Sequence, residues 1–387
     1  MIKPLMKVIV APDKFKGSLT AHEAAQAIAE GVRQAFPDAE IVLCPMADGG
    51  EGTLALLLEQ THGIKHEVRV LDPLGREVSA AIGFSQTGQW AFIEMAQASG
   101  VQLLTPEEQN PRFTSTYGTG QLIRSAIERG ASQILMGLGG SATNDGGMGM
   151  ATALGWTFWD EQGHLLQPSG AALSKIAAVS DADVPKHLKS LNLMAACDVT
   201  NPLYGPNGAA HVFASQKGAK NKDLKTLDDG LRNLAAVLER FGYCSDLEAQ
   251  VPGSGAAGGL GFGLRVFCGA KLQSGMDVLM QYAKIHDHLQ TADVLITGEG
   301  KIDHQTSFGK VVHKLAEAAQ KQDVPVIALC GTLDLNPIQI RGLGLAYAAS
   351  ILPRPMSLEE AQRGATTFLA QHTTQVIQLF YLTPFFR

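Results

Sequence analysis

A glycine-rich segment, GLGGSATNDGGMG at residues 137–149, carries the strongest chemical signal in this sequence. Its other residues are mostly small, hydroxylic or amidic, and no lysine follows the glycines, so it is not a P-loop. The apolar run QILMGL precedes it, and MGMATALG, which can be helical, follows it. A strand, a glycine loop and a helix in this order direct free backbone N–H groups at an anion. We therefore predict a phosphate-binding loop with contacts from Gly139, Gly140, Ser141, Thr143, Asn144 and Asp145. The alternative is a structural turn closed by an Asx motif, which would need fewer glycines.

A second segment, GEGKIDHQTSFGK at residues 298–310, combines carboxylates, lysines and hydroxyls. It follows the apolar run DVLIT, at the strand end where open α/β sheets bind their ligands. Carboxylates suit Mg²⁺ binding or proton abstraction, and lysines suit phosphate charge. Glu299, Asp303 and Lys310 are the candidates here, and an ion-paired surface turn is the alternative.

Three shorter segments also place charged side chains after apolar runs. APDKFKGS (11–18) contains Lys14 and Lys16, MADGGEGT (46–53) contains Asp48, and CDVTNPLYG (197–205) contains Asp198. Each has an ordinary alternative: a solvated loop for the lysines, a helix-dipole contact for Asp48 and an Asx turn for Asp198.

The segment PGSGAAGGLGFG (252–263) is equally rich in glycine but has no charge and one hydroxyl. For this segment we predict close backbone packing, not ligand binding.

Composition excludes several classes of protein. The 387 residues carry a net charge of −6, without the basic field of a nucleic-acid binder. The sequence contains no run of about 18 apolar residues and no apolar N-terminal stretch of signal-peptide length. Its five cysteines form no C-x-x-C pair, which is typical of reduced thiols. We expect a cytoplasmic protein without membrane or nucleic-acid partners.

The elements that position these residues alternate at both ends of the chain. Apolar runs typical of buried strands occur at 7–11, 41–46, 293–298, 325–331 and 345–352, with amphipathic helical patterns between them. Thr20 and Glu23 have the spacing of a capping box at the first helix. Alternating strands and helices predict a parallel sheet covered on both faces. In the middle of the chain, where we expect a helix at 222–241, the strand and helix patterns alternate less regularly. This difference suggests an inserted domain.

The chain resembles the glycerate kinase type-1 family of bacteria. The stretches that carry the resemblance occur in the family's order from about residue 7 to about residue 365: APDKFKGSLTAHEAAQAI, MADGGEGT, DPLGR, IEMAQASG, GTGQLI, GLGGSATNDGGMG, CDVTNPLYG, QKGA, SGAAGGLG and GEGKIDHQTSFGK. Any one glycine loop is weak evidence, whereas the ordered set is specific. One departure is Ala214-Ser215 before QKGA, where the family often has Gly-Pro; it concerns the loop that carries Lys217.

The resemblance implies two α/β domains. Residues 1–75 and 290–387 would form a flavodoxin-like parallel-sheet domain, and residues 76–289 an inserted domain with a mixed sheet. It also implies an active site in the cleft between them.

The resemblance further implies ATP-dependent, Mg²⁺-assisted phosphorylation of D-glycerate, most often to 2-phosphoglycerate. Asp198 and Asp303 are candidates for general base and metal ligand, with Glu299 as a further metal ligand and Asp48 as a third catalytic acid. Lys14, Lys16 and Lys310 would offset phosphate or glycerate charge. The partners are then small molecules, and a homodimer is left open.

Two other functions fit parts of the sequence. Kinases of the galactokinase and homoserine kinase superfamily have a similar glycine loop, but Gly140 stands here at the position of a serine and their upstream proline is absent. A non-catalytic regulator that binds a sugar acid is the other alternative, although the acids beside the phosphate-type loops argue against it.

Overall fold

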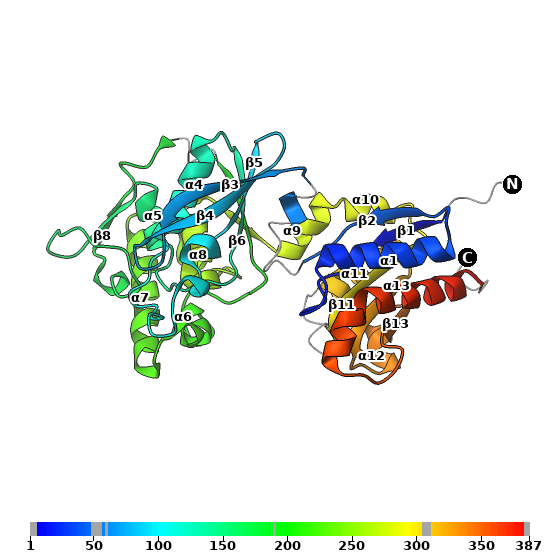
Figure 1. Cartoon of the computed structure of the whole chain (residues 1–387). Helices are drawn as coiled ribbons and strands as arrows, with labels where there is room; N and C mark the ends of the chain where they lie inside the picture. Colours follow the sequence, from blue (N-terminus) through cyan, green and yellow to red (C-terminus); the bar gives the residue numbers. More distant parts are fainter. Residues whose placement is uncertain are drawn as a thin grey trace. The chain divides into compact units, whose positions relative to one another are not determined.

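The structure is a computed structural model that describes residues 6–47, 56–58, 61–186, 188, 191–303 and 311–382. For residues 381 and 382 it describes the backbone alone. The chain divides into two compact units. Unit 1 contains residues 1–48 and 276–387, and unit 2 contains residues 49–275. Both chain ends therefore belong to one unit, coloured blue and yellow to red in Figure 1.

Unit 1 has a five-stranded, fully parallel sheet in the order β13-β12-β11-β1-β2. The strands are β1 (Lys7–Val10), β2 (Glu40–Leu43), β11 (Val294–Ile302), β12 (Val326–Leu333) and β13 (Tyr347–Ser350). Counted along unit 1 alone, this is the 2-1-3-4-5 order of flavodoxin-like folds. The strand order reverses between β1 and β11, and this reversal is where such sheets bind ligands.

The helices of unit 1 connect these strands. They are α1 (Ala21–Ala35), α9 (Gly275–Tyr282, which starts at the last residue of unit 2), α10 (Ile285–Leu289), α11 (Val311–Gln320), α12 (Pro337–Gly342) and α13 (Leu358–Leu382). The capping box predicted from Thr20 and Glu23 is confirmed at the start of α1. In Figure 1, α1 (blue) and α13 (red) lie side by side, and the hydroxyl of Thr374 donates to the carbonyl of Gly31 at 3.1 Å. A Cβ at Gly31 would overlap the backbone of Ala370, so glycine allows the two helices to approach.

Unit 2 has a mixed six-stranded sheet in the order β10-β9-β6-β5-β4-β3. The strands are β3 (Ile64–Leu71), β4 (Glu77–Phe84), β5 (Trp90–Glu94), β6 (Gln133–Gly137), β9 (Asn192–Ala196) and β10 (Lys271–Gln273). The last four are parallel, whereas β3 and β4 form an antiparallel edge. A separate antiparallel pair joins β7 (Thr157–Trp159) to β8 (Ala178–Ser180).

The helices of unit 2 pack around one buried apolar cluster. They are α3 (Ala96–Ser99), α4 (Tyr117–Glu128), α5 (Met148–Ala153), α6 (Ala209–Phe213), α7 (Asn221–Arg240) and α8 (Ala256–Cys268), with 3₁₀ turns η1 (Val101–Leu103), η2 (Leu173–Lys175), η4 (Ser215–Lys217) and η5 (Asp246–Gln250). The helix predicted at 222–241 matches α7 within one residue. Within the described ranges, no helix is long and apolar enough to cross a membrane.

The predicted domain boundaries need correction. We placed them after residues 75 and 289, whereas the structure places them after Asp48 and Gly275. β3 pairs along its whole length with β4, so residues 64–71 belong to the sheet of unit 2. At the other boundary, Met276 onwards packs with unit 1.

Candidate active site

The reversal point of the unit 1 sheet gathers one group of predicted residues. The loop after β1 is bound to the end of β11, because the Asp13 amide donates to the carbonyl of Gly298 at 2.8 Å. The buried hydroxyl of Thr297 also donates to the carbonyl of Ala11 at 2.8 Å. These bonds bring the segment with Lys14 and Lys16 beside the strand end with Glu299.

Charged side chains of both signs lie at this edge. Glu299 is nearly buried, with 9% of its surface exposed, whereas Lys16 is exposed and Lys14 is half-buried. The ammonium of Lys301 forms an ion pair with Asp303 Oδ2 at 3.0 Å, and the hydrogen bond that it donates to this carboxylate raises the pKa of Lys301. The structure thus brings Lys14, Lys16, Glu299 and Asp303 together at one end of the sheet.

Asp13 belongs to the same edge and was not among the predicted site residues. Its carboxyl is 8% exposed, and its Oδ1 accepts the amide of Lys14 at 2.6 Å. The available signal was its position just after the apolar run at residues 7–11, where a carboxylate is costly without a partner. Asp48 and Lys310, which were predicted, lie outside the described residues.

The parallel half of the unit 2 sheet forms a second edge. Glu94, Gly137, Ala196 and Gln273 stand in register across β5, β6, β9 and β10. The glycine loop leaves β6 just beyond this row, and Asp198 follows β9. The exposed Asp198 accepts hydrogen bonds on Oδ1 from the hydroxyl of Ser274 at 2.9 Å and the amide of Gly275 at 3.1 Å.

Only the first turn of the glycine loop reaches the surface. Gly139 and Gly140 are exposed, and every residue from Ser141 to Met150 is buried. Gly140 has a φ of +74°, which favours glycine. Among the described residues, the amides of Gly139 and Gly140 donate to no protein group. They are therefore the two amides of this loop best placed to meet an anion.

Asp145 does not have the ligand-binding position that we predicted. It is 0% exposed, and its carboxylate accepts four hydrogen bonds within the protein. The donors are the amide and hydroxyl of Thr116, at 2.8 and 2.9 Å, and the amides of Gly147 and Gly149, at 3.2 and 3.1 Å. Burial raises the pKa of this carboxyl, against the opposing effect of these bonds. Asp145 therefore joins the starts of α4 and α5, and its bonding capacity is used internally.

Thr143 and Asn144 are also 0% exposed. The Thr143 hydroxyl and both side-chain amide atoms of Asn144 have no partner within the described part of the chain. The Thr143 carbonyl accepts a hydrogen bond from Lys217 Nζ at 2.8 Å. Side-chain contact of these two residues with a phosphate, as predicted, would require the loop to move.

The second glycine-rich segment explains why the loop is buried. The predicted close backbone packing of residues 252–263 is confirmed, because a Cβ at Gly258 would overlap the carbonyl of Thr143. A Cβ at Gly259 would lie 2.9 Å from the Cα of Gly146, and the Gly146 amide donates to the carbonyl of Gly258 at 3.0 Å.

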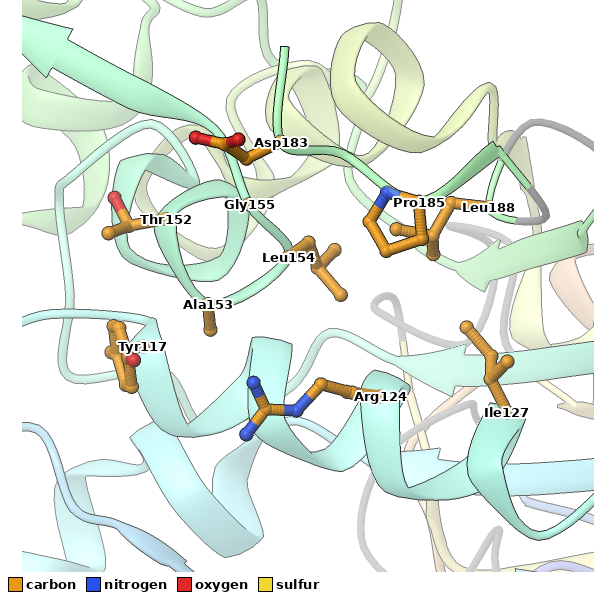
Figure 2. A pocket seen from close by; sticks show the side chains of 10 residues that line it. All are labelled: Tyr117, Arg124, Ile127, Thr152, Ala153, Leu154, Gly155, Asp183, Pro185 and Leu188. Carbon is orange, nitrogen blue, oxygen red and sulfur yellow. The ribbon is translucent and has the colours of Figure 1, made fainter. Parts of the chain in front are cut away.

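A cavity of about 250 Å³ lies elsewhere in unit 2 and is shown in Figure 2. Residues from α4, the end of α5 and the chain at 183–188 line it, and none of them is a predicted site residue. Arg124 extends into the space between α4 and α5, whereas the carboxylate of Asp183 points away from it (Figure 2). Arg124 also pairs with Glu128 at 3.7 Å. The one acid in the lining, Asp183, points away from the space, so we do not assign the phosphoryl transfer to this cavity.

Comparison with known proteins decides the family. The sequence profile of the glycerate kinase family matches residues 8–381. The chain belongs to the glycerate kinase family. This membership replaces the galactokinase and homoserine kinase alternative and makes the chain a phosphotransferase.

Individual members of the family are similar over nearly the whole chain. A glycerate kinase of Halalkalibacterium halodurans is 44% identical over 364 residues, covering 94% of this chain and 95% of the relative. The glycerate 2-kinase of Escherichia coli K12 is 42% identical over 362 residues, covering 93% and 94%. A crystal structure assigned to a glycerate kinase 2 of Salmonella typhimurium LT2 superposes with a TM-score of 0.88 at 39% identity, covering 97% of this chain and 98% of that one.

Proposed function

We propose that this chain transfers the γ-phosphoryl group of ATP to the 2-hydroxyl of D-glycerate, giving 2-phosphoglycerate and ADP. Membership of the glycerate kinase family supports the reaction, and the similarity to a glycerate 2-kinase supports the position of transfer.

The observation that carries the proposal is the chemistry at the carboxyl ends of the two parallel strand sets. In unit 2, exposed glycine amides directly follow β6 and a carboxylate follows β9. In unit 1, lysines and carboxylates lie together at the reversal point of a flavodoxin-like sheet. Backbone amides bind phosphate oxygens, lysines offset anionic charge, and carboxylates bind metal or take up a proton.

Each group then has a proposed part in the reaction. The transition state of phosphoryl transfer is loose, with charge spread over the phosphoryl oxygens, so positioning and electrostatics supply most of the catalysis. The amides of Gly139 and Gly140 would hold nucleotide phosphates, and Lys14 and Lys16 would bind the glycerate carboxylate or a phosphate. The general base accepts the proton of the glycerate hydroxyl as the new O–P bond forms and the bond to ADP breaks.

Asp198 and Asp303 are the candidates for the base and for a ligand of Mg²⁺, with Glu299 as a further ligand. In the described residues no three metal-binding side chains lie together. Proteins usually hold Mg²⁺ through one or two carboxylates together with substrate phosphates and water, so one or two of these acids would suffice. When bound, the ion would neutralise charge on the phosphates.

The proposed location is the cytoplasm. The five cysteines are free thiols, which fits a reducing compartment, and fractionation of the producing cells would test the location.

The direct test measures ADP release by the purified protein with Mg·ATP and D-glycerate, with homoserine and galactose as parallel acceptors. We expect turnover with D-glycerate alone. Addition of enolase then identifies the product, because enolase acts on 2-phosphoglycerate and not on the 3-isomer. No turnover with glycerate would contradict the reaction, and a product that enolase leaves unchanged would contradict only the position of transfer.

A further inference from the structure

The Thr143 carbonyl lies in the glycine loop just beyond the point, after Gly140, where the loop passes from the surface into the interior. The exposed glycines at 139 and 140 precede it, and the buried turn that leads into α5 follows it. The backbone that carries the exposed amides, which is also held by the bond from the Val101 amide to the Gly140 carbonyl at 2.9 Å, runs within a few residues into this carbonyl.

Lys217 contacts this carbonyl from a distant part of the sequence. Its Nζ donates to Thr143 O at 2.8 Å, and only 3% of the residue is exposed. Lys217 ends the 3₁₀ turn η4, and Gly218 follows with a φ of +92°. A Cβ at Gly218 would overlap the carbonyl of Gln109, so the backbone that presents Lys217 is itself fixed by packing.

The same carbonyl is confined on another side by Gly258, whose missing Cβ leaves just enough room for it. The loop thus packs against the backbone at the start of α8 and accepts a hydrogen bond from Lys217, which we call a polar anchor. Asp145, which binds the starts of α4 and α5, is the second polar anchor.

The remaining polar side chains of the buried turn do not contribute to this anchoring. The Thr143 hydroxyl and the Asn144 amide make no hydrogen bond within the described residues. Three side chains therefore supply side-chain bonds to this stretch: Lys217 and Asp145, and Thr114, whose hydroxyl donates to the carbonyl of Ala142 at 2.9 Å.

A buried lysine has a large desolvation cost, which an apolar residue would avoid. Burial lowers the pKa of Lys217 to about 7, although the nearby Asp145 opposes this shift. Both protonation states of the amine carry N–H donors, so the bond to Thr143 does not depend on the charge.

We propose that Lys217 is a positioning residue for nucleotide binding: by fixing the Thr143 carbonyl, it holds the amides of Gly139 and Gly140 where they meet the phosphates of ATP. This inference rests on the proposed function, which assigns the phosphates to these amides.

The test compares Lys217→Met, which keeps an unbranched chain but removes the donor, with Lys217→Arg, which retains N–H donors. Lys222→Met is the matched control, because Lys222 is exposed on α7. Binding of a non-hydrolysable ATP analogue and of D-glycerate is measured separately by calorimetry. We expect Lys217→Met to weaken analogue binding by about tenfold or more, the usual effect of losing one well-placed hydrogen bond, with glycerate binding little changed. Lys217→Arg should lose less, and Lys222→Met should bind as the wild type does.

Hydrogen–deuterium exchange gives a second readout. In Lys217→Met, exchange should increase in residues 139–147 and remain at the wild-type level in the strands of unit 2. Analogue binding at wild-type strength, equal losses in the Met and Arg variants, or unfolding of unit 2 in both variants would each overturn the proposal. Failure of the proposed function appears differently, as absence of glycerate turnover by the wild-type protein, while analogue binding still tests Lys217.

Discussion

Asp198 and Asp303 occupy different surroundings, although both were selected as acids that follow a strand. Asp198 is exposed and accepts hydrogen bonds from Ser274 and Gly275, whereas Asp303 is half-buried and paired with Lys301. Asp198 therefore shares its Oδ1 with two neutral donors, whereas the carboxylate of Asp303 is paired with a cation.

Replacement of either acid should lower the rate without loss of fold. We expect Asp198→Asn and Asp303→Asn each to reduce kcat for glycerate by at least about 100-fold, the usual contribution of a general base. Asp229→Asn, at an exposed ion pair on α7, is the control and should keep wild-type kcat. Steady-state kinetics together with far-UV circular dichroism provide the measurement. A variant that retains near wild-type kcat would remove that acid from the mechanism.

Lys217 should give the stability of the protein a specific pH dependence. Its pKa in the folded protein is about 7, below the ordinary lysine value of 10.5. Between these values the unfolded chain holds a proton that the folded chain has released, so this group makes the free energy of unfolding rise with pH across that window. Below about pH 7 both states are protonated and the contribution is constant.

The measurement is urea unfolding of the wild type and Lys217→Met at about pH 7 and about pH 9. We expect the wild type to gain stability relative to the variant as the pH rises. The comparison cancels the titration of other groups, including the buried thiols. Parallel pH dependence of the two proteins would show that Lys217 keeps an ordinary pKa.

Residue types identified the site region more reliably than they identified individual roles. The glycine loop, Asp198 and Asp303 do lie at strand ends, as their sequence positions predicted. The burial of Asp145 was not foreseen, because its partner Thr116 and the second glycine-rich stretch that packs against its loop are distant in sequence. Lys217 was seen only as part of QKGA, since no local pattern shows that its amine contacts Thr143.

At the scale of elements, the glycine loop and the start of α8 function as one packed unit. Residues 257–259 have positive φ inside the span of α8, so the chain makes a left-handed turn against the loop. The glycine content of both segments predicted backbone without side chains in the way. Their contact with each other could not be predicted, because it depends on the tertiary structure. The strands and helices could likewise be read from apolar periodicity, whereas the 2-1-3-4-5 order required the family resemblance or the structure.

This packing predicts a large effect for one methyl group. Gly258→Ala should lower the free energy of unfolding by at least about 2 kcal/mol more than Gly88→Ala, because overpacking adds to the strain. Gly88 is a close match, since its φ is +70° against +69° for Gly258, but a Cβ there meets nothing within 4 Å. Denaturant unfolding followed by tryptophan fluorescence measures both. Equal losses would mean that only backbone strain matters at these positions.

At the scale of the whole molecule, the chain begins and ends in unit 1 and forms unit 2 in between. In the sequence, this insertion appears as a loss of the regular alternation of strands and helices. That pattern could not place the domain boundary. The hairpin of β3 and β4 carries alternating patterns that either domain could use, and only the pairing of the two strands assigns it.

The two units should respond separately to a change in one of them. Trp90, Trp156 and Trp159 are the three tryptophans of the chain, and all lie in unit 2. Gly31→Ala places a methyl group against Ala370 between α1 and α13, so we expect the thermal transition of unit 1, followed by circular dichroism, to move to lower temperature. The tryptophan transition should keep its wild-type midpoint.

Gly342→Ala, in α12 of the same unit, is the control, because a Cβ there meets nothing within 4 Å. It should leave both transitions unchanged or raise that of unit 1 slightly. A Gly31→Ala variant whose two transitions shift together would show that the units unfold cooperatively.

Asp198 contacts the last two residues of unit 2, after which the chain passes into unit 1. The hydroxyl of Ser274 and the amide of Gly275 both donate to its Oδ1, and Met276 is the first residue of the other unit. An ion or substrate that binds this oxygen would compete with the hydrogen bonds from Ser274 and Gly275. Occupancy of this one carboxylate would therefore change the hydrogen bonds of the two residues that precede Met276.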